Sequence, residues 1–137
     1  LGIVHVPVQR LTYWGGLGLG SWRRSDQGQQ AIKVSPPLPG QVLKVVGSRS
    51  HLTAETQVYL AGLGEYELVS VGSSLKFCLL AEGRAHLYPR LGPTCEWDTA
   101  AAQAVVEGAG GHVETLEGEP LRYGKSDILN PWFVART

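Results

Sequence analysis

Asp98 is one of three aspartates in the chain, and it stands at the start of a predicted helix. Gly92-Pro93 breaks the strand before it, and the alanine-rich run at 99–109 favours helix. Two interpretations are open. Asp98 could cap the helix and stabilise its dipole, or it could bind a hard divalent cation such as Mg²⁺, which leaves coordination places for substrate phosphate. One carboxylate cannot form such a site, and neither other aspartate stands in a cluster with glutamates.

A second group that suits phosphate is Ser73, Ser74 and Lys76, which follow a predicted strand and open a predicted helix. Backbone N–H groups and hydroxyls at such a junction suit an anion, and Lys76, one turn into the helix, adds a point charge. The alternative is that either serine only caps the helix. The planar guanidinium of Arg90 is also suited to phosphate, whereas a solvated surface role is equally compatible with its type.

The elements that must position these residues alternate between strand and helix beyond residue 40. The predicted strands are 41–46, 66–71, 85–88, 112–116 and 132–135, and the predicted helices are 53–63, 73–82 and 98–109. This alternation predicts a layered α/β domain with a mostly parallel sheet flanked by helices. The strand-to-helix junctions at 48–51 and 72–76 then lie near the sheet edge that Asp98 faces.

Residues 1–35 form a separate unit in this interpretation. Strands are predicted at 2–8 and 10–14, and the glycines at 15–20 are assigned to a hairpin. They are not a nucleotide-binding loop, because the polar segment after them is not helical. The proline-rich stretch 34–40 excludes helix and central strand, so it marks the boundary between domains 1–35 and 36–137.

Composition limits the classes of function. The chain has 137 residues, 43% hydrophobic and 18% charged, which is ordinary for a globular protein with its own core. Its formal net charge of zero argues against a nucleic-acid polymer as partner. Its apolar runs are too short to cross a bilayer, and no signal peptide pattern is present, although peripheral association with a membrane is compatible with this composition. Cys78 and Cys95 have no partner motif and suit reduced thiols, so we expect a cytoplasmic location.

Four sequence strings together carry a resemblance to a known family. They are Gly72-Ser-Ser-Leu-Lys-Phe-Cys, Tyr88-Pro-Arg, Glu96-Trp-Asp-Thr-Ala-Ala followed by a glycine pair, and Leu129-Asn-Pro. Over essentially its whole length the chain resembles the C-terminal half of the magnesium-dependent, lithium-sensitive phosphatases related to inositol monophosphatase. Within that family it most resembles the bacterial 3'(2'),5'-bisphosphate nucleotidases of sulfur assimilation.

The resemblance implies roles for particular residues. Asp98 is expected to complete one Mg²⁺ site, and Ser73, Lys76, Arg90 and His51 to bind a nucleotide bisphosphate. No residue of this chain is expected to be catalytic by itself. His86 stands where the family often has an acid, which changes the local charge near Arg90. The remaining histidines are expected to have no role in the site.

The resemblance also implies that part of the enzyme is absent. The family's metal centre uses a glutamate pair and an Asp-Pro-x-Asp-Gly motif from an N-terminal half, and neither occurs here. The chain has no methionine and opens on Leu1. We therefore expect residues 1–35 to be a hairpin remnant of the N-terminal phosphatase domain, residues 36–137 to be the substrate-binding domain, and the chain alone to be inactive. The missing half is its expected partner.

The activity that this implies is hydrolysis of the 3'-phosphate of adenosine 3',5'-bisphosphate. Two alternatives stay open. One is an inositol monophosphatase-like activity, against which the cations Lys76 and Arg90 argue, because a second phosphate calls for extra positive charge. The other is a non-catalytic α/β module that binds an anion or a partner chain.

Overall fold

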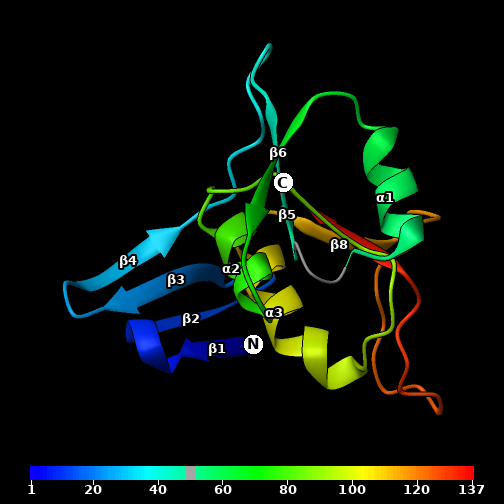
Figure 1. Ribbon diagram of the computed structural model, residues 1–137. Coiled ribbons are helices and arrows are strands. Elements are labelled where there is room, and N and C mark those ends of the chain that lie inside the picture. The colour runs from blue at the N-terminus through cyan, green and yellow to red at the C-terminus, as the bar shows by residue number, and fades with distance from the viewer. Residues whose placement is uncertain (49–51) are drawn as a thin grey trace.

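The computed structural model describes residues 1–48 and 52–137, which form layers of sheet and helix (Figure 1). The first layer contains the strands β1 (Gly2–Val6), β2 (Leu11–Gly16), β3 (Gly20–Ser25) and β4 (Gly28–Ile32). The strands of the second sheet are β5 (Leu43–Gly47), β6 (Tyr66–Ser70), β7 (Leu87–Arg90), β8 (His112–Thr115) and β9 (Phe133–Arg136). The α-helices are α1 (Ala54–Ala61), α2 (Leu75–Ala81) and α3 (Glu96–Gly108).

The first sheet is antiparallel in the order β1-β2-β3-β4. The expected two-stranded hairpin is thus a four-stranded sheet, and the polar segment interpreted as turns forms β3 and β4. Four of the five residues of β4 are exposed, so this strand lacks the alternation that marks a half-buried strand in sequence. Trp14 and Trp22 stack across β2 and β3 with ring centroids 6.3 Å apart.

The second sheet has the order β6-β5-β7-β9-β8. β5 pairs in parallel with β6 and β7, as the strand–helix alternation predicts. β9 pairs antiparallel with both β7 and β8. Four of the five described strands therefore run in the same direction, as expected for a mostly parallel sheet, and β9 alone runs the other way between β7 and β8, so that the sheet is mixed. The layered α/β class itself is confirmed.

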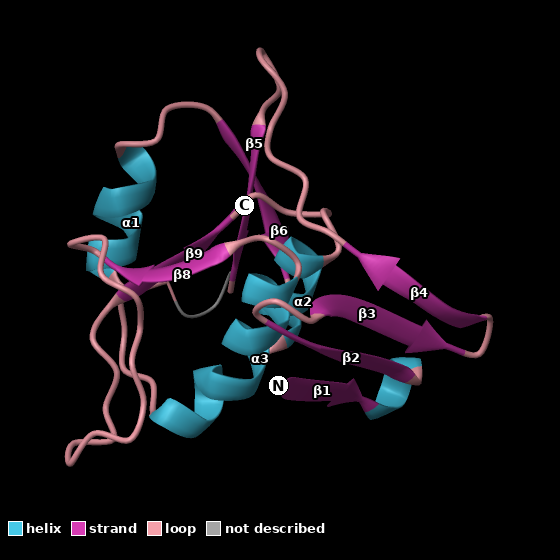
Figure 2. Cartoon of the chain, turned by 180° about the vertical axis from the view of Figure 1, so that it is seen from behind, coloured by secondary structure: helices cyan, strands magenta, loops and turns pink. Residues whose placement is uncertain are grey.

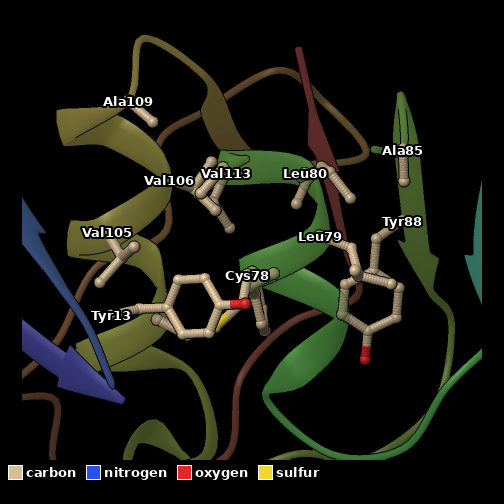
Figure 3. Packing of buried hydrophobic residues seen from close by; sticks show 14 of the residues in the cluster. Tyr13, Cys78, Leu79, Leu80, Ala85, Tyr88, Val105, Val106, Ala109 and Val113 are labelled. Carbon is tan, nitrogen blue, oxygen red and sulfur yellow. The ribbon is translucent and has the colours of Figure 1, made fainter. Parts of the chain in front are cut away.

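Helices α2 and α3 lie between the two sheets (Figure 2), and α1 packs on the outer face of the second sheet. One apolar core joins all the inner layers, from Tyr13 on β2 through Cys78 on α2 and Val105 on α3 to Phe133 on β9 (Figure 3). The first sheet thus shares its core with the helices of the second unit. The division at residue 35 stays a prediction.

Small residues let α3 approach the first sheet closely. A Cβ atom at Gly108 would lie 2.6 Å from the backbone nitrogen of Gly16, nearer than two such atoms can come. The hydroxyl of Ser21 donates a hydrogen bond of 2.7 Å to the Val105 carbonyl. This contact satisfies a buried hydroxyl and holds the helix in register with β3.

The connection from β8 to β9 runs along the N-terminal half of α3 and is held there by polar contacts. We call residues 118–131 the strap. The Glu96 carboxylate accepts hydrogen bonds from the backbone nitrogens of Gly124 and Lys125, at 3.0 and 3.1 Å, and from Lys125 Nζ at 2.6 Å. These contacts lower the pKa of Glu96 to about 2, chiefly through the Lys125 side chain. The strap is therefore fixed to the first turn of α3 by charge-assisted hydrogen bonds.

None of the helices in the described ranges is both long and apolar enough to span a membrane.

Candidate active site

A pocket of about 360 Å³ opens where the ends of β5, β6 and β7 meet the start of α3. Its wall includes Ser73, Lys76, Arg90 and Asp98, so the structure brings four of the five predicted site residues together. The fifth, His51, lies outside the described residues. The other lining residues are Ser48, Gly72, Ser74, Phe77, Tyr88, Pro93, Thr94 and Thr99.

Asp98 is held at one side of this pocket by a local cap. The helix begins at Glu96, slightly before the predicted start near Asp98, with Cys95 as its N-cap. Asp98 Oδ2 accepts a hydrogen bond of 2.8 Å from the Cys95 backbone nitrogen. The side chain forms no ion pair with any residue in the described ranges. Asp98 therefore caps the helix and still presents a carboxylate oxygen to the pocket.

The residues present fit one ligand position of a hard cation. A carboxylate is the donor that Mg²⁺ prefers, and Asp98 lines the pocket. Glu96 is the nearest acidic neighbour in sequence, and its carboxylate forms an ion pair with Lys125. Within residues 1–48 and 52–137 no group of three or more His, Cys, Asp or Glu side chains could hold a metal ion. Asp98 alone would thus supply one ligand position and not a complete metal centre.

Lys76 is the main buried charge in the pocket. It is only 6% exposed, and its Nζ lies 5.3 Å from the centroid of the Tyr88 ring. Burial lowers the pKa of Lys76, and the charge of Arg90 lowers it further. Among the described residues it has no carboxylate partner. A bound anion would offset both the loss of hydration and the repulsion from Arg90, so the surroundings of Lys76 favour a negatively charged ligand.

Arg90 supplies the second cation. One of its Nη atoms donates a hydrogen bond of 3.1 Å to the Pro93 carbonyl, which fixes the guanidinium against the turn before α3. Its Nε is buried and has no partner among the described residues. The alternative of a solvated surface arginine does not match this environment, since Arg90 is partly buried and lines the pocket.

Ser73 has an unusual backbone conformation. Its φ is +51°, in the left-handed region that serine seldom adopts. Ser74 occupies the N-cap of α2, but its side chain makes no capping hydrogen bond. Neither hydroxyl bonds to a described residue, and both line the pocket. Strain of this kind costs on the order of 1–3 kcal/mol and is found at functional sites.

Tyr88 is a site residue that the sequence reasoning did not single out. Its ring packs edge-on against Phe77 and Phe133, and its hydroxyl points away from the labelled core side chains (Figure 3). Burial raises its pKa. It also lines a second, adjoining pocket of about 190 Å³, together with Lys76 and Arg90. The Tyr88-Pro-Arg string was noted in the sequence, but a role in the site was assigned only to its arginine.

His86 has a structural role. It is buried, and its Nδ1 accepts a hydrogen bond of 2.9 Å from the Lys44 backbone nitrogen. Burial, followed by the charge of the Lys44 side chain, lowers the pKa of His86. The neutral ring therefore adds no charge beside Arg90.

Comparison with known proteins shows the family of the chain. The sequence profile of the inositol monophosphatase family matches residues 1–132. The chain is 47% identical to the 3'(2'),5'-bisphosphate nucleotidase CysQ of Escherichia coli (strain K12), over 97% of this chain and 53% of that protein. It is 38% identical to the CysQ of Buchnera aphidicola subsp. Acyrthosiphon pisum (strain APS), over 98% of this chain and 51% of that protein.

Among solved structures, CysQ from Bacteroides thetaiotaomicron superposes with a TM-score of 0.89 at 39% identity, covering 98% of this chain and 56% of that one. Staphylococcal IMPase-II, at 17% identity and a TM-score of 0.78, shares the fold, with 98% of this chain and 50% of that chain covered. The chain belongs to the inositol monophosphatase family. It spans about half the length of the curated CysQ relatives that it matches.

Proposed function

We propose that the chain forms the substrate-binding part of a metal-dependent phosphatase that removes the 3'-phosphate of adenosine 3',5'-bisphosphate. The observation that carries this proposal is the single pocket shared by the Asp98 carboxylate and the two cations Lys76 and Arg90. The names of the CysQ relatives, which are 3'(2'),5'-bisphosphate nucleotidases, support the choice of substrate.

The two sides of the pocket have different roles in this proposal, one towards the metal ion and the other towards the nucleotide. Asp98 would hold one Mg²⁺ together with carboxylates from a part of the protein outside the described residues. When bound, the metal would activate water and stabilise the attacking and leaving oxygens of an in-line displacement. Lys76, Arg90, Ser73 and, beyond the described residues, His51 would hold the rest of the nucleotide. A second phosphate beside two cations is favourable because charge-assisted hydrogen bonds are the stronger ones.

A partner surface for the remaining carboxylates is available on the first sheet. Trp14 and Trp22 stand on the face opposite Tyr13, and Tyr13 packs toward α3. We propose that a further part of the protein, outside these residues, covers this face and supplies the other metal ligands.

The test is a substrate panel on the intact protein with Mg²⁺. Phosphate release from adenosine 3',5'-bisphosphate is expected to exceed that from inositol 1-phosphate and from adenosine 5'-monophosphate at equal concentration. A preference for inositol 1-phosphate would favour the inositol monophosphatase-like alternative. Binding of the bisphosphate without release, at saturating Mg²⁺, would favour a non-catalytic module.

A further inference from the structure

Asn130 is buried behind the wall of the pocket and holds the start of α3. It is 8% exposed. Its Nδ2 lies 3.2 Å from Thr94 Oγ1, 2.9 Å from the Cys95 carbonyl and 3.0 Å from Thr99 Oγ1. Its backbone nitrogen donates a further bond of 2.9 Å to the Thr94 carbonyl. One side chain of the strap therefore fixes three successive parts of the turn into α3.

Each of these contacts lies next to the pocket. Thr94 and Thr99 line it, whereas Asn130 does not. The Cys95 carbonyl accepts from Asn130, and the nitrogen of the same residue donates to Asp98 Oδ2 at 2.8 Å. The Cys95 N–H thus holds the Asp98 carboxylate, while the Asn130 amide holds the same residue through its carbonyl, which belongs to the following peptide group.

Other contacts also hold this segment: the Leu91 carbonyl accepts a hydrogen bond of 2.8 Å from Thr53 Oγ1, and the Glu96 nitrogen donates one of 2.9 Å to the Ile128 carbonyl. Residues 91–94 lie outside any helix or strand, and Pro93 cannot donate a backbone hydrogen bond. The Arg90 guanidinium holds the Pro93 carbonyl from the pocket side, and Asn130 holds the residues after it from the core side. Removing the amide would leave Thr94 Oγ1 without its partner, whereas the Cys95 carbonyl keeps the Asp98 nitrogen and Thr99 Oγ1 keeps the Tyr123 hydroxyl, so the turn loses side-chain support on its core side.

We propose that Asn130 is a positioning residue for the metal ligand Asp98: its amide fixes the Thr94–Thr99 turn so that the carboxylate is held ready for a divalent cation. This inference rests on the proposed function, because it takes Asp98 as a metal ligand. Groups that orient metal ligands raise metal affinity without touching the metal. Asn130 is the middle residue of the Leu129-Asn-Pro string, and holding the turn before α3 is the role that this inference gives to the asparagine.

Gln103 provides a matched control. It is also buried, and its Nε2 donates to the Leu121 carbonyl at 3.2 Å, so it holds the strap to α3 as Asn130 does. It lies further along the helix and does not line the pocket. Gln103→Leu therefore loosens the same strap without touching Thr94 or Cys95, and Gln103 is joined to Thr99 only through the hydroxyl of Tyr123.

The experiment measures Mn²⁺ binding to the intact protein by electron paramagnetic resonance of the free ion, without substrate. Asn130→Ala is expected to weaken Mn²⁺ binding about tenfold, at the lower end of the range for groups that support metal ligands. Asn130→Ser is the second variant if the alanine protein does not fold, with the same expected direction. Gln103→Leu is expected to bind Mn²⁺ as the unaltered protein does.

A second readout separates positioning from general damage. The Mg²⁺ concentration for half-maximal phosphate release should rise in the Asn130 variants, while the KM for adenosine 3',5'-bisphosphate at saturating Mg²⁺ should stay within about twofold, because the Lys76 and Arg90 side of the pocket is intact.

The outcomes distinguish this inference from the function on which it rests. The role of Asn130 would be overturned if the Asn130 variant that folds binds Mn²⁺ within twofold of the unaltered protein, or if Gln103→Leu loses as much affinity. Either result would leave the proposed activity standing. Weakened Mn²⁺ binding in a protein that releases no phosphate would support Asn130 and overturn the phosphatase. No Mn²⁺ binding by the unaltered protein would overturn both.

Discussion

The ammonium of Lys76 lies 5.3 Å from the centroid of the Tyr88 ring, in a pocket where the described residues offer it no carboxylate. A cation–π contact offsets only part of the cost of burying a charge. The pocket therefore keeps a cation that folding alone does not favour, as expected for a site that binds anions.

Lys76→Met keeps the side-chain volume and removes the charge. The free energy of unfolding should stay the same or rise, because a buried charge is removed. Affinity for adenosine 3',5'-bisphosphate should fall on the order of 10- to 100-fold, since a hydrogen bond to a charged group contributes about 1.5–3 kcal/mol. Urea unfolding and calorimetric titration of the intact protein measure the two quantities. Lys33→Met, at an exposed position outside the pocket, is the control, and equal nucleotide affinity for both variants would refute the role of Lys76.

Asp98→Asn separates the cap from the metal ligand. An asparagine oxygen can still accept from the Cys95 nitrogen, so the melting temperature should change little. Activity of the intact protein should fall by orders of magnitude and recover only partly with excess Mg²⁺, because the lost carboxylate both weakens and misplaces the metal. Near-normal turnover would show that Asp98 is only a cap.

Residues 1–137 alone should release no phosphate above background from adenosine 3',5'-bisphosphate with Mg²⁺. Asp98 is one carboxylate, and the described part of the chain groups no others with it. A sensitive phosphate assay suffices. Turnover at even a hundredth of a typical enzyme's roughly 10 per second would contradict this prediction.

The Glu96–Lys125 contact should make stability depend on pH in acid. The pKa of Glu96 falls from 4.5 to about 2 on folding, so its stabilising contribution is complete above about pH 4.5 and is lost as the pH falls toward 2. Glu96→Gln should lower the urea midpoint at neutral pH, and the difference from the unaltered chain should shrink over that interval. A constant difference would mean that the carboxylate charge is not what holds the strap.

The sequence predicted best where local chemistry decides the structure. The alanine run and the glycines after it define α3, and this placement put Asp98 at the pocket. β7 begins two residues later than predicted and extends through Pro89 to Arg90. Pro89 has no N–H to donate and lies beyond Leu87, the one β7 residue that pairs with β5, and its partner on β9 is Val134, 45 residues away.

Other features depend on contacts that a single sequence does not reveal. The strand β4 is polar because one edge and much of its surface face solvent. Asn130 meets Thr94 and Thr99 only when the strap lies along α3, over separations of 36 and 31 residues. Tyr88 was overlooked for the same reason, since a tyrosine in an apolar strand looks like an ordinary core residue until the fold places it in the wall of the pocket.

The position of β9 has a consequence for the order of assembly. β8 pairs only with β9 among the described strands, and β9 is the last element of the chain. During synthesis, β8 leaves the ribosome with no described neighbour to pair with until β9 has emerged. The emergence of β9 is therefore the event that permits the second sheet to close, and a ribosome stalled before that point would hold a nascent chain with β7 and β8 still apart.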